Sequence, residues 1–343
     1  MKFNFLAACG LVAAAALPIQ ASAQEVTLKV HFFLPPTSFA ATLFIQPWCD
    51  KVAKESGNKL KCQLYPSMQL GGTPPQLYDQ VRDGVADVVW TLPGYTAGRF
   101  PSIEAFELPF MMQSPEATSR ALWDFVQLHA QSEFKDVKPL AFHVHGDGVF
   151  HMASKPVKSM ADLRGLKLRA PTRQTNKFIA MLGATPVSMP VPQVGDALSK
   201  GVIDGAVVPY EVVPSVKLQE LAKFHAETDP AQPAFYTSTF IFAMNKAKYE
   251  SLPAELKKVI DANSGQSLSG QIGKAFLQAD MEGKKLVAPA SVNVIPAAEL
   301  ATWKLLGNKL AADWVKDMDA KGLAGAKLLE DAKALIAKHA AAR

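Results

Sequence analysis

The stretch Gly165-Leu166-Lys167-Leu168-Arg169-Ala170-Pro171-Thr172 decides how the rest of the chain is interpreted. Residues 166–169 have the pattern of a short strand that ends at a proline. Because Pro171 disfavours helical geometry at Ala170, the chain leaves the strand extended. Arg169 is therefore expected at the carboxyl end of a strand, the edge at which open α/β sheets bind their ligands.

Arg169 offers a planar, permanently charged guanidinium that matches a carboxylate with two hydrogen bonds. Its expected position at the end of a strand suggests that it captures the carboxylate of a small molecule. The alternative is a surface arginine in an ordinary ion pair, and the local pattern alone leaves both open.

The segments around this stretch alternate between strands and helices, which is the doubly wound α/β pattern. Strands are expected over 26–33, 60–65, 85–90, 139–145, 148–154, 166–169, 185–188, 205–208, 235–245 and 292–295, with 139–145 and 148–154 forming a pair. Helices are expected after Thr37 or Ser38, from Pro74, from Ser114, over 174–182, over 194–200, from Pro209, as one long helix over 253–286, and twice at the C-terminus. The chain is expected to cross between two domains more than once.

The first 23 residues have the features of a secretory signal peptide. Lys2 supplies the positive start, residues 3–17 the apolar segment, and Ala21-Ser22-Ala23 the small-residue site, with cleavage expected after Ala23. Leu6-Ala7-Ala8-Cys9 resembles a lipoprotein box, but almost no apolar segment precedes it. We therefore expect an exported, periplasmic protein without a membrane anchor.

The mature chain of 320 residues is long enough for two domains. Without Lys2 it carries 35 basic and 31 acidic residues, a mild excess of positive charge spread along the sequence. This balance argues against nucleic acid as a partner and is compatible with an anionic ligand.

Cys49 and Cys62 are the two cysteines that remain after cleavage of the signal. Cys49 is expected on a helix and Cys62 on the following strand, where it alternates with Leu60 and Leu64. In an oxidising compartment the pair forms either a disulfide or two buried thiols.

Signals for catalysis are weak. His143-Val144-His145-Gly146-Asp147 has the spacing of a metallohydrolase motif, but Gly148 stands where that motif needs a further histidine, so polar strand residues are the simpler interpretation. The chain has no Gly-x-Ser-x-Gly elbow, no complete dinucleotide fingerprint and no phosphate-binding loop. We expect neither a metal nor another cofactor, and no enzymatic activity.

A set of aromatic residues falls near the predicted strand ends, beside turn residues. Each belongs either to a core or to a binding pocket, and an aromatic rim around Arg169 would suit a ligand with one anionic end and a flat or apolar body. The set consists of Phe33, Trp90, Tyr95, Phe150, Tyr210 and Tyr236.

Six ordered segments together resemble the extracytoplasmic solute-binding proteins of tripartite ATP-independent periplasmic (TRAP) transporters, the DctP-like family. Each segment is weak alone, but their order and spacing over nearly the whole mature chain are specific. The segments are 64–72 with Tyr-Pro and Gln-Leu-Gly-Gly, 81–87, Glu107-Leu108-Pro109-Phe110-Met111, 156–171, Leu182-Gly183-Ala184-Thr185-Pro186, and 197–205 ending in Asp204-Gly205.

This resemblance implies a two-lobed α/β fold, each lobe a sheet flanked by helices, with a long helix bridging both lobes. Lobe I is expected over residues 24–146 plus 235–274, and lobe II over 147–234 plus 275–343. The lobes would close around an organic acid, and the protein would deliver it to the small and large membrane subunits of a TRAP transporter driven by an ion gradient. The resemblance also identifies Arg169 with the arginine that pairs with the ligand carboxylate.

Two departures from sialate-type members concern the ligand. Val149 stands where those members carry a second arginine, and Val208 stands where they carry an asparagine. A second carboxylate or many hydroxyls would lack partners here, at about 1–3 kcal/mol per group. We therefore expect an aromatic monocarboxylate such as benzoate, hydroxybenzoate or benzoylformate. An aliphatic 2-oxo acid, a binding protein of an ATP-driven transporter, a periplasmic enzyme and a sensor's binding partner remain alternatives.

Overall fold

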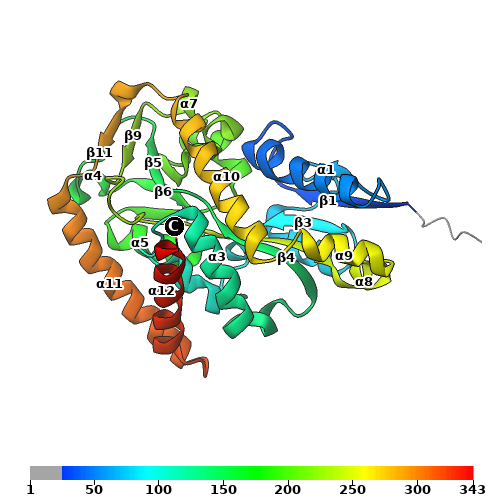
Figure 1. Ribbon diagram of the computed structural model, residues 1–343. Helices are drawn as coiled ribbons and strands as arrows, with labels where there is room; N and C mark the ends of the chain where they lie inside the picture. Colours follow the sequence, from blue (N-terminus) through cyan, green and yellow to red (C-terminus); the bar gives the residue numbers. More distant parts are fainter. Residues whose placement is uncertain (1–24, 343) are drawn as a thin grey trace, which may run out of the picture.

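The computed structural model describes residues 25–342 as two β-sheets, each flanked by helices (Figure 1). The first sheet has the strand order β2-β1-β3-β10-β4, and the second has the order β11-β9-β5-β8-β6-β7. The first comprises β1 Val26–Phe32, β2 Leu60–Tyr65, β3 Val88–Thr91, β4 Val137–Val144 and β10 Thr239–Asn245. The second comprises β5 Val149–Met152, β6 Lys167–Ala170, β7 Thr185–Ser188, β8 Gly205–Val208, β9 Phe224–Glu227 and β11 Val292–Val294.

Parallel pairing dominates where the sequence alternates strand and helix. β1 pairs in parallel with β2 and β3, and β6 pairs in parallel with β7 and β8. The central strands carry long apolar runs because helices or other elements cover both faces, and every residue of β3, β8 and β10 is buried. These observations confirm the expected two-lobed α/β fold. Strand β9 and helix α8 were not predicted.

The helices that cover the two sheets vary from single turns to 23 residues. They are α1 Gln46–Glu55, α2 Leu77–Arg82, α3 Pro115–Phe125, α4 Met160–Leu163, α5 Arg173–Met181, α6 Val194–Ser199, α7 Leu218–Leu221, α8 Lys246–Ser251, α9 Ala254–Ala262, α10 Gln266–Lys284, α11 Ala297–Asp319 and α12 Gly325–Ala341. Ser114 caps α3 as expected, since its hydroxyl accepts a hydrogen bond from the Ala117 amide.

The expected pairing of the strands around residues 139–145 and 148–154 is wrong. β4 pairs with β10 in the first sheet, whereas β5 pairs with β8 and β9 in the second. The short connection between β4 and β5 is therefore a crossing from the first sheet to the second. It runs beside the return crossing at Tyr236, where the Gly148 amide donates to the Tyr236 carbonyl at 3.2 Å. A Cβ at Gly148 would lie 2.0 Å from the Tyr236 ring, so the glycine permits this close approach.

The single long helix expected over residues 253–286 is two helices. The chain breaks between α9 and α10, where Gly265 has a φ of +89° and its amide donates to the Leu140 carbonyl at 2.7 Å. The second helix, α10, packs against α3 and β4, with its first half close to α3, and its C-terminal end meets the 3-10 helix Tyr210–Val216 at Gly283. It therefore bridges the two lobes, as Figure 1 shows, and the expected bridging helix is confirmed.

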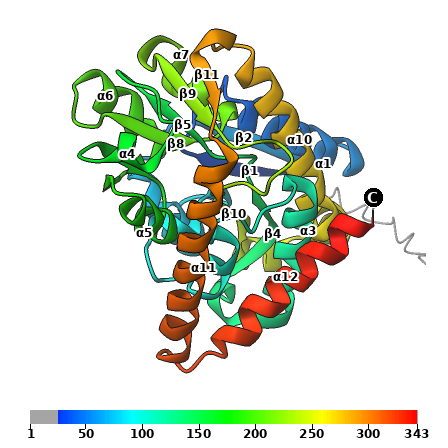
Figure 2. The ribbon, with the colours of Figure 1, turned by 90° about the vertical axis from the view of Figure 1, so that its left-hand side faces the viewer.

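The two C-terminal helices lie on different lobes. α11 packs against α5, whereas α12 folds back onto α3 (Figure 2). Helix α3 packs on β4 of the first sheet, so α12 lies with the first sheet. The expected assignment of all of residues 275–343 to the second lobe therefore does not hold for α12. The remaining lobe boundaries stay a prediction.

Cys49 on α1 and Cys62 on β2 are joined by a disulfide bond across 13 residues of chain. This is the first of the two alternatives that the cysteine spacing left open. The signal peptide, its cleavage after Ala23 and the lipoprotein-like box lie outside the described residues. Among the helices of residues 25–342, none combines the length and the apolar composition that a membrane span requires.

Candidate ligand-binding site

Arg169 lies in β6, between β8 and β7, one residue before the strand ends. Its side chain is 1% exposed. Nε donates to the Met189 carbonyl at 3.0 Å and Nη1 to the Val207 carbonyl at 3.1 Å, which fixes the plane of the guanidinium. Nη2 is buried and has no hydrogen-bond partner. The interpretation of Arg169 as a surface residue in an ion pair is therefore wrong.

A cavity lies against Arg169, and its empty space, the opening included, is about 320 Å³. Residues from both lobes line it: Phe33, Trp90 and Phe240 belong to the first, and Arg169 and Val208 to the second. Small-molecule sites are of this kind, mostly apolar with a few polar groups that fix the orientation of the ligand. Of the predicted site residues, Phe33, Trp90, Arg169, Val208 and Tyr236 line this cavity.

Stacked rings form one wall of the cavity. The Trp90 ring lies between Phe33, at a centroid distance of 4.9 Å, and Phe240, at 5.0 Å, and both pairs are nearly parallel. The indole N–H donates to His143 Nε2 at 2.8 Å. Burial lowers the pKa of His143 to about 3, so its ring is neutral and accepts this bond. The wall is consequently rigid and flat, which suits a planar apolar ligand.

Tyr236 lies beside Arg169 where the chain crosses back to the first lobe. Its hydroxyl donates to the Val207 carbonyl at 3.1 Å, the same carbonyl that accepts from Arg169 Nη1. Burial raises the pKa of the Tyr236 phenol, which therefore stays protonated. Tyr95 lies behind Phe33, edge to face at 5.8 Å, and its hydroxyl accepts from the Val191 amide at 3.1 Å. Tyr95 thus contacts Phe33 of the first lobe and Val191 of the second next to the cavity, but it does not line the cavity.

Three predicted site residues point elsewhere. The Tyr210 hydroxyl donates to Glu227 at 3.0 Å, on the far side of β8. The Phe150 ring stacks on Phe235 at 4.7 Å inside the second lobe. Val149 is paired with Val208 across two strands but does not line the cavity. All three side chains are buried because they pack within the second lobe, and none of them faces the cavity between the lobes.

Sequence reasoning missed three polar residues that line the cavity: His145, Glu211 and Ser238. His145 was noticed only as part of a metal-like motif, and its Nδ1 contacts the Gly146 carbonyl at 2.7 Å. Burial lowers its pKa to about 3, which keeps the ring neutral. Within residues 25–342, no three metal-ligating side chains come together. Glu211 directly follows Pro209 and Tyr210, so its place beside the predicted site residue Tyr210 was the one signal in the sequence.

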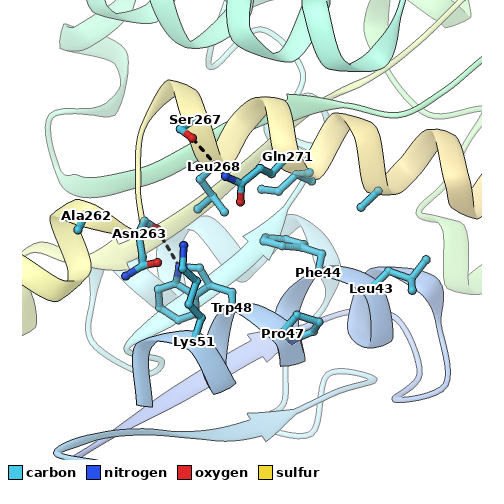
Figure 3. A pocket seen from close by; sticks show the side chains of 12 residues that line it. Leu43, Phe44, Pro47, Trp48, Lys51, Ala262, Asn263, Ser267, Leu268 and Gln271 are labelled. Carbon is cyan, nitrogen blue, oxygen red and sulfur yellow. Dashed lines mark hydrogen bonds between the residues drawn. The ribbon is translucent and has the colours of Figure 1, made fainter. Parts of the chain in front are cut away.

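A second hollow, of about 640 Å³, lies on the surface between α1 and α10 (Figure 3). Its polar groups are largely paired with one another: Trp48 Nε1 donates to the Asn263 carbonyl at 2.9 Å, and Gln271 donates to Ser267 at 3.2 Å. The cation among its described lining residues, Lys51, is exposed. Unlike the cavity at Arg169, this groove offers no buried charge to a ligand.

A family model of bacterial extracellular solute-binding proteins, family 7 (DctP), matches residues 34–324. The chain belongs to this family. Its fold and its buried arginine at a cavity between the lobes agree with a solute-binding protein of a TRAP transporter, which binds a small organic acid and works with membrane subunits.

Solved structures of TRAP solute-binding proteins are similar to the chain over almost their whole length. One from Rhodoferax ferrireducens, with copurified benzoate, is 53% identical, covers 93% of this chain and 99% of its own, and superposes with a TM-score of 0.91. One from a marine metagenome, with 3-hydroxybenzoate, is 50% identical, covers 92% and 99%, and has a TM-score of 0.90. One from Bordetella bronchiseptica, with bound mandelate, is 27% identical, covers 92% and 99%, and has a TM-score of 0.83.

Proposed function

We propose that this protein captures an aromatic monocarboxylate in the periplasm, in the cavity at Arg169, and delivers it to the membrane subunits of a TRAP transporter. The observation that carries the proposal is the free Nη2 donor of Arg169 at the cavity between the lobes, whose wall includes the stacked ring of Trp90. A carboxylate satisfies this donor, and a planar ring would lie against the aromatic wall that Phe33, Trp90 and Phe240 form.

The charge of the cavity favours one carboxylate rather than two. Among the described residues that line it, Arg169 is the one cation, because burial keeps His145 neutral. A second ligand carboxylate would be buried without a partner, which costs several kcal/mol. Benzoate and 3-hydroxybenzoate, which two of the similar proteins contain, are monocarboxylates with a planar ring.

We infer that the protein is a receptor rather than an enzyme. Ser238 and His145 both line the cavity. Ser238 Oγ has no hydrogen-bond partner, so it is not bonded to the His145 ring. The serine thus lacks the base that would activate it as a nucleophile. Incubation of the protein with benzoate, followed by chromatography, is expected to return the acid unchanged.

Binding is tested by thermal unfolding of mature protein that was unfolded in guanidinium and refolded, so that any copurified ligand is removed. A ligand at 100 times its Kd stabilises the folded state by about 2.7 kcal/mol. For a chain of this size that raises the Tm by about 4 °C. We expect this shift with benzoate, hydroxybenzoate or benzoylformate and none with succinate or sialate. A shift with succinate alone would contradict the aromatic assignment.

Export is tested separately. Mass spectrometry of the protein from a periplasmic fraction is expected to show a chain that begins at Gln24. A chain that retains residues 1–23 would contradict cleavage after Ala23.

A further inference from the structure

Three polar atoms of residues that line the cavity are buried and have no hydrogen-bond partner: Arg169 Nη2, Glu211 Oε2 and Ser238 Oγ. Each of these residues is at most 1% exposed. A buried polar atom without a partner is costly, so each points to a group that a ligand supplies. The ligand carboxylate accounts for Arg169 and leaves Glu211 and Ser238.

The backbone of Glu211 is held at the cavity. It follows β8 in the 3-10 helix Tyr210–Val216, and its amide donates to Asp280 Oδ1 on α10 at 2.8 Å. The bridging helix thus fixes this turn against the second lobe. Arg169 Nη2 and Glu211 Oε2 are not hydrogen-bonded to each other, so each has its hydrogen-bonding capacity available to a ligand.

The state of the Glu211 carboxyl suits an uncharged partner. Burial, together with the nearby Asp280 carboxyl, raises its pKa well above the ordinary value of a glutamic acid. In its protonated form, which this shift favours, the carboxyl carries one O–H donor and one carbonyl acceptor and does not repel a ligand carboxylate bound at Arg169. A hydroxyl group both donates and accepts, so it matches both functions.

We propose that Glu211 recognises a hydroxyl group on the ligand, so that the protein prefers hydroxylated aromatic acids to benzoate. The inference rests on the proposed function, because it requires the carboxylate of the same ligand at Arg169. Benzoate would leave the Glu211 carboxyl facing an apolar ring. A site built to bond a hydroxyl discriminates against the analogue that lacks one, and we expect a preference of at least about tenfold in Kd.

Ser238 is the competing candidate for the hydroxyl. A carboxyl has both a donor and an acceptor to satisfy, whereas a serine hydroxyl rotates and finds a neighbour more easily. The larger cost of an unmatched carboxyl therefore makes Glu211 the group that discriminates. The two assignments differ in which substitution removes the preference.

Calorimetric titrations of refolded mature protein with benzoate, 3-hydroxybenzoate and 4-hydroxybenzoate test the proposal. Both hydroxyl positions are included because the orientation of the ring is not fixed by Arg169 alone. The titrations compare the wild-type protein with Glu211→Met, Glu211→Gln and Ser238→Ala, each checked for a wild-type unfolding transition. Glu211→Gln retains a donor and an acceptor and is the matched control.

We expect the wild-type protein and Glu211→Gln to bind one hydroxybenzoate at least tenfold more tightly than benzoate. Glu211→Met is expected to reduce this ratio to about one while binding benzoate at least as tightly as the wild type. The proposal is overturned if the wild type shows no preference, if Glu211→Met retains it, or if Ser238→Ala abolishes it. Wild-type protein that binds none of the three acids would instead refute the proposed function.

Discussion

Replacement of Arg169 by methionine tests the anion-binding group directly. Arg169→Met keeps an unbranched apolar stem and removes the guanidinium, whose Nε and Nη1 hold the Met189 and Val207 carbonyls and whose Nη2 is free. In the variant, a ligand carboxylate entering the cavity would be buried without a counter-charge.

The expected loss follows from the burial of the site. Leaving one partner of a buried ion pair alone costs about 3–5 kcal/mol, which corresponds to a Kd about 10²- to 10⁴-fold higher for benzoate. The ligand-free fold is expected to change little. Two carbonyls lose a donor at about 1 kcal/mol each, while a buried charge without an ion-pair partner is removed. The free energy of unfolding is thus expected to stay within about 2 kcal/mol of the wild-type value.

The assay is calorimetric titration with benzoate and with benzamide, its neutral analogue, for wild-type protein and for Arg169→Met. The four affinities form a cycle that isolates the interaction between the guanidinium and the ligand charge. Benzoate binding is expected to weaken far more than benzamide binding, with a coupling of at least about 2 kcal/mol. A folded variant that binds benzoate within threefold of the wild type would refute the assignment of Arg169.

The remaining predictions concern packing, pH and the disulfide. Phe150→Ala is expected to lower the free energy of unfolding by about 3–5 kcal/mol without changing the Kd for benzoate, whereas Trp90→Ala is expected to change both. Denaturant unfolding and calorimetric titration check this prediction. A loss of affinity in Phe150→Ala would place its ring at the ligand. Burial raises the pKa of Asp280 to about 8, so the folded state binds more protons than the unfolded state between about pH 4 and pH 8, and stability falls as the pH rises through this window. Asp280→Asn is expected to flatten the fall by up to about 1.4 kcal/mol per pH unit, measured by urea unfolding at pH 5 to 8, and an unchanged slope would contradict the buried neutral carboxyl. The variant with both Cys49→Ala and Cys62→Ala is expected to lose about 3 kcal/mol of stability in the same measurement, because without the disulfide the unfolded chain regains the conformational entropy of the closed loop. A stability equal to that of the wild type would show that the disulfide contributes nothing.

The position of Arg169 was predictable because it depends on a local pattern. A short apolar alternation, then a proline, places the residue at the end of a strand without information from the rest of the chain. The same reasoning located Phe33, directly after the end of β1, and Trp90, one residue before the end of β3, whereas Val208 was selected by the resemblance to the family. For Phe33 and Trp90, position along the strand was sufficient to predict proximity to the cavity.

The same reasoning failed where the direction of a side chain decided its role. Phe150 lies at the start of β5 near the crossing, yet its ring turns into the second lobe and stacks on Phe235, 85 residues later in the chain. Tyr210 is the first residue of the 3-10 helix that follows β8, and its hydroxyl points toward Glu227. Neighbouring residues at a strand end face different environments, and only distant partners determine which one faces the ligand.

The sequence by itself determined the order of most strands and helices, the α/β class and the strand-end arginine, whereas the two lobes were implied by the resemblance to the family. The first three features follow from periodicities of two and 3.6 residues and from proline and glycine at the ends of elements, all of which act over a few residues. It could not determine that β4 and β5 lie in different sheets, or that the helix after β10 breaks at Gly265.

Only the tertiary structure decided the chemistry of the cavity. Burial, together with the Asp280 carboxyl 69 residues away on α10, raises the pKa of Glu211 well above its ordinary value, and Asp280 also accepts from its backbone amide. Arg169 has a free donor because Met189 and Val207 occupy its other nitrogens. Desolvation and hydrogen bonding depend on which segments surround a group in space, so the properties of these residues exist only once both lobes are folded together.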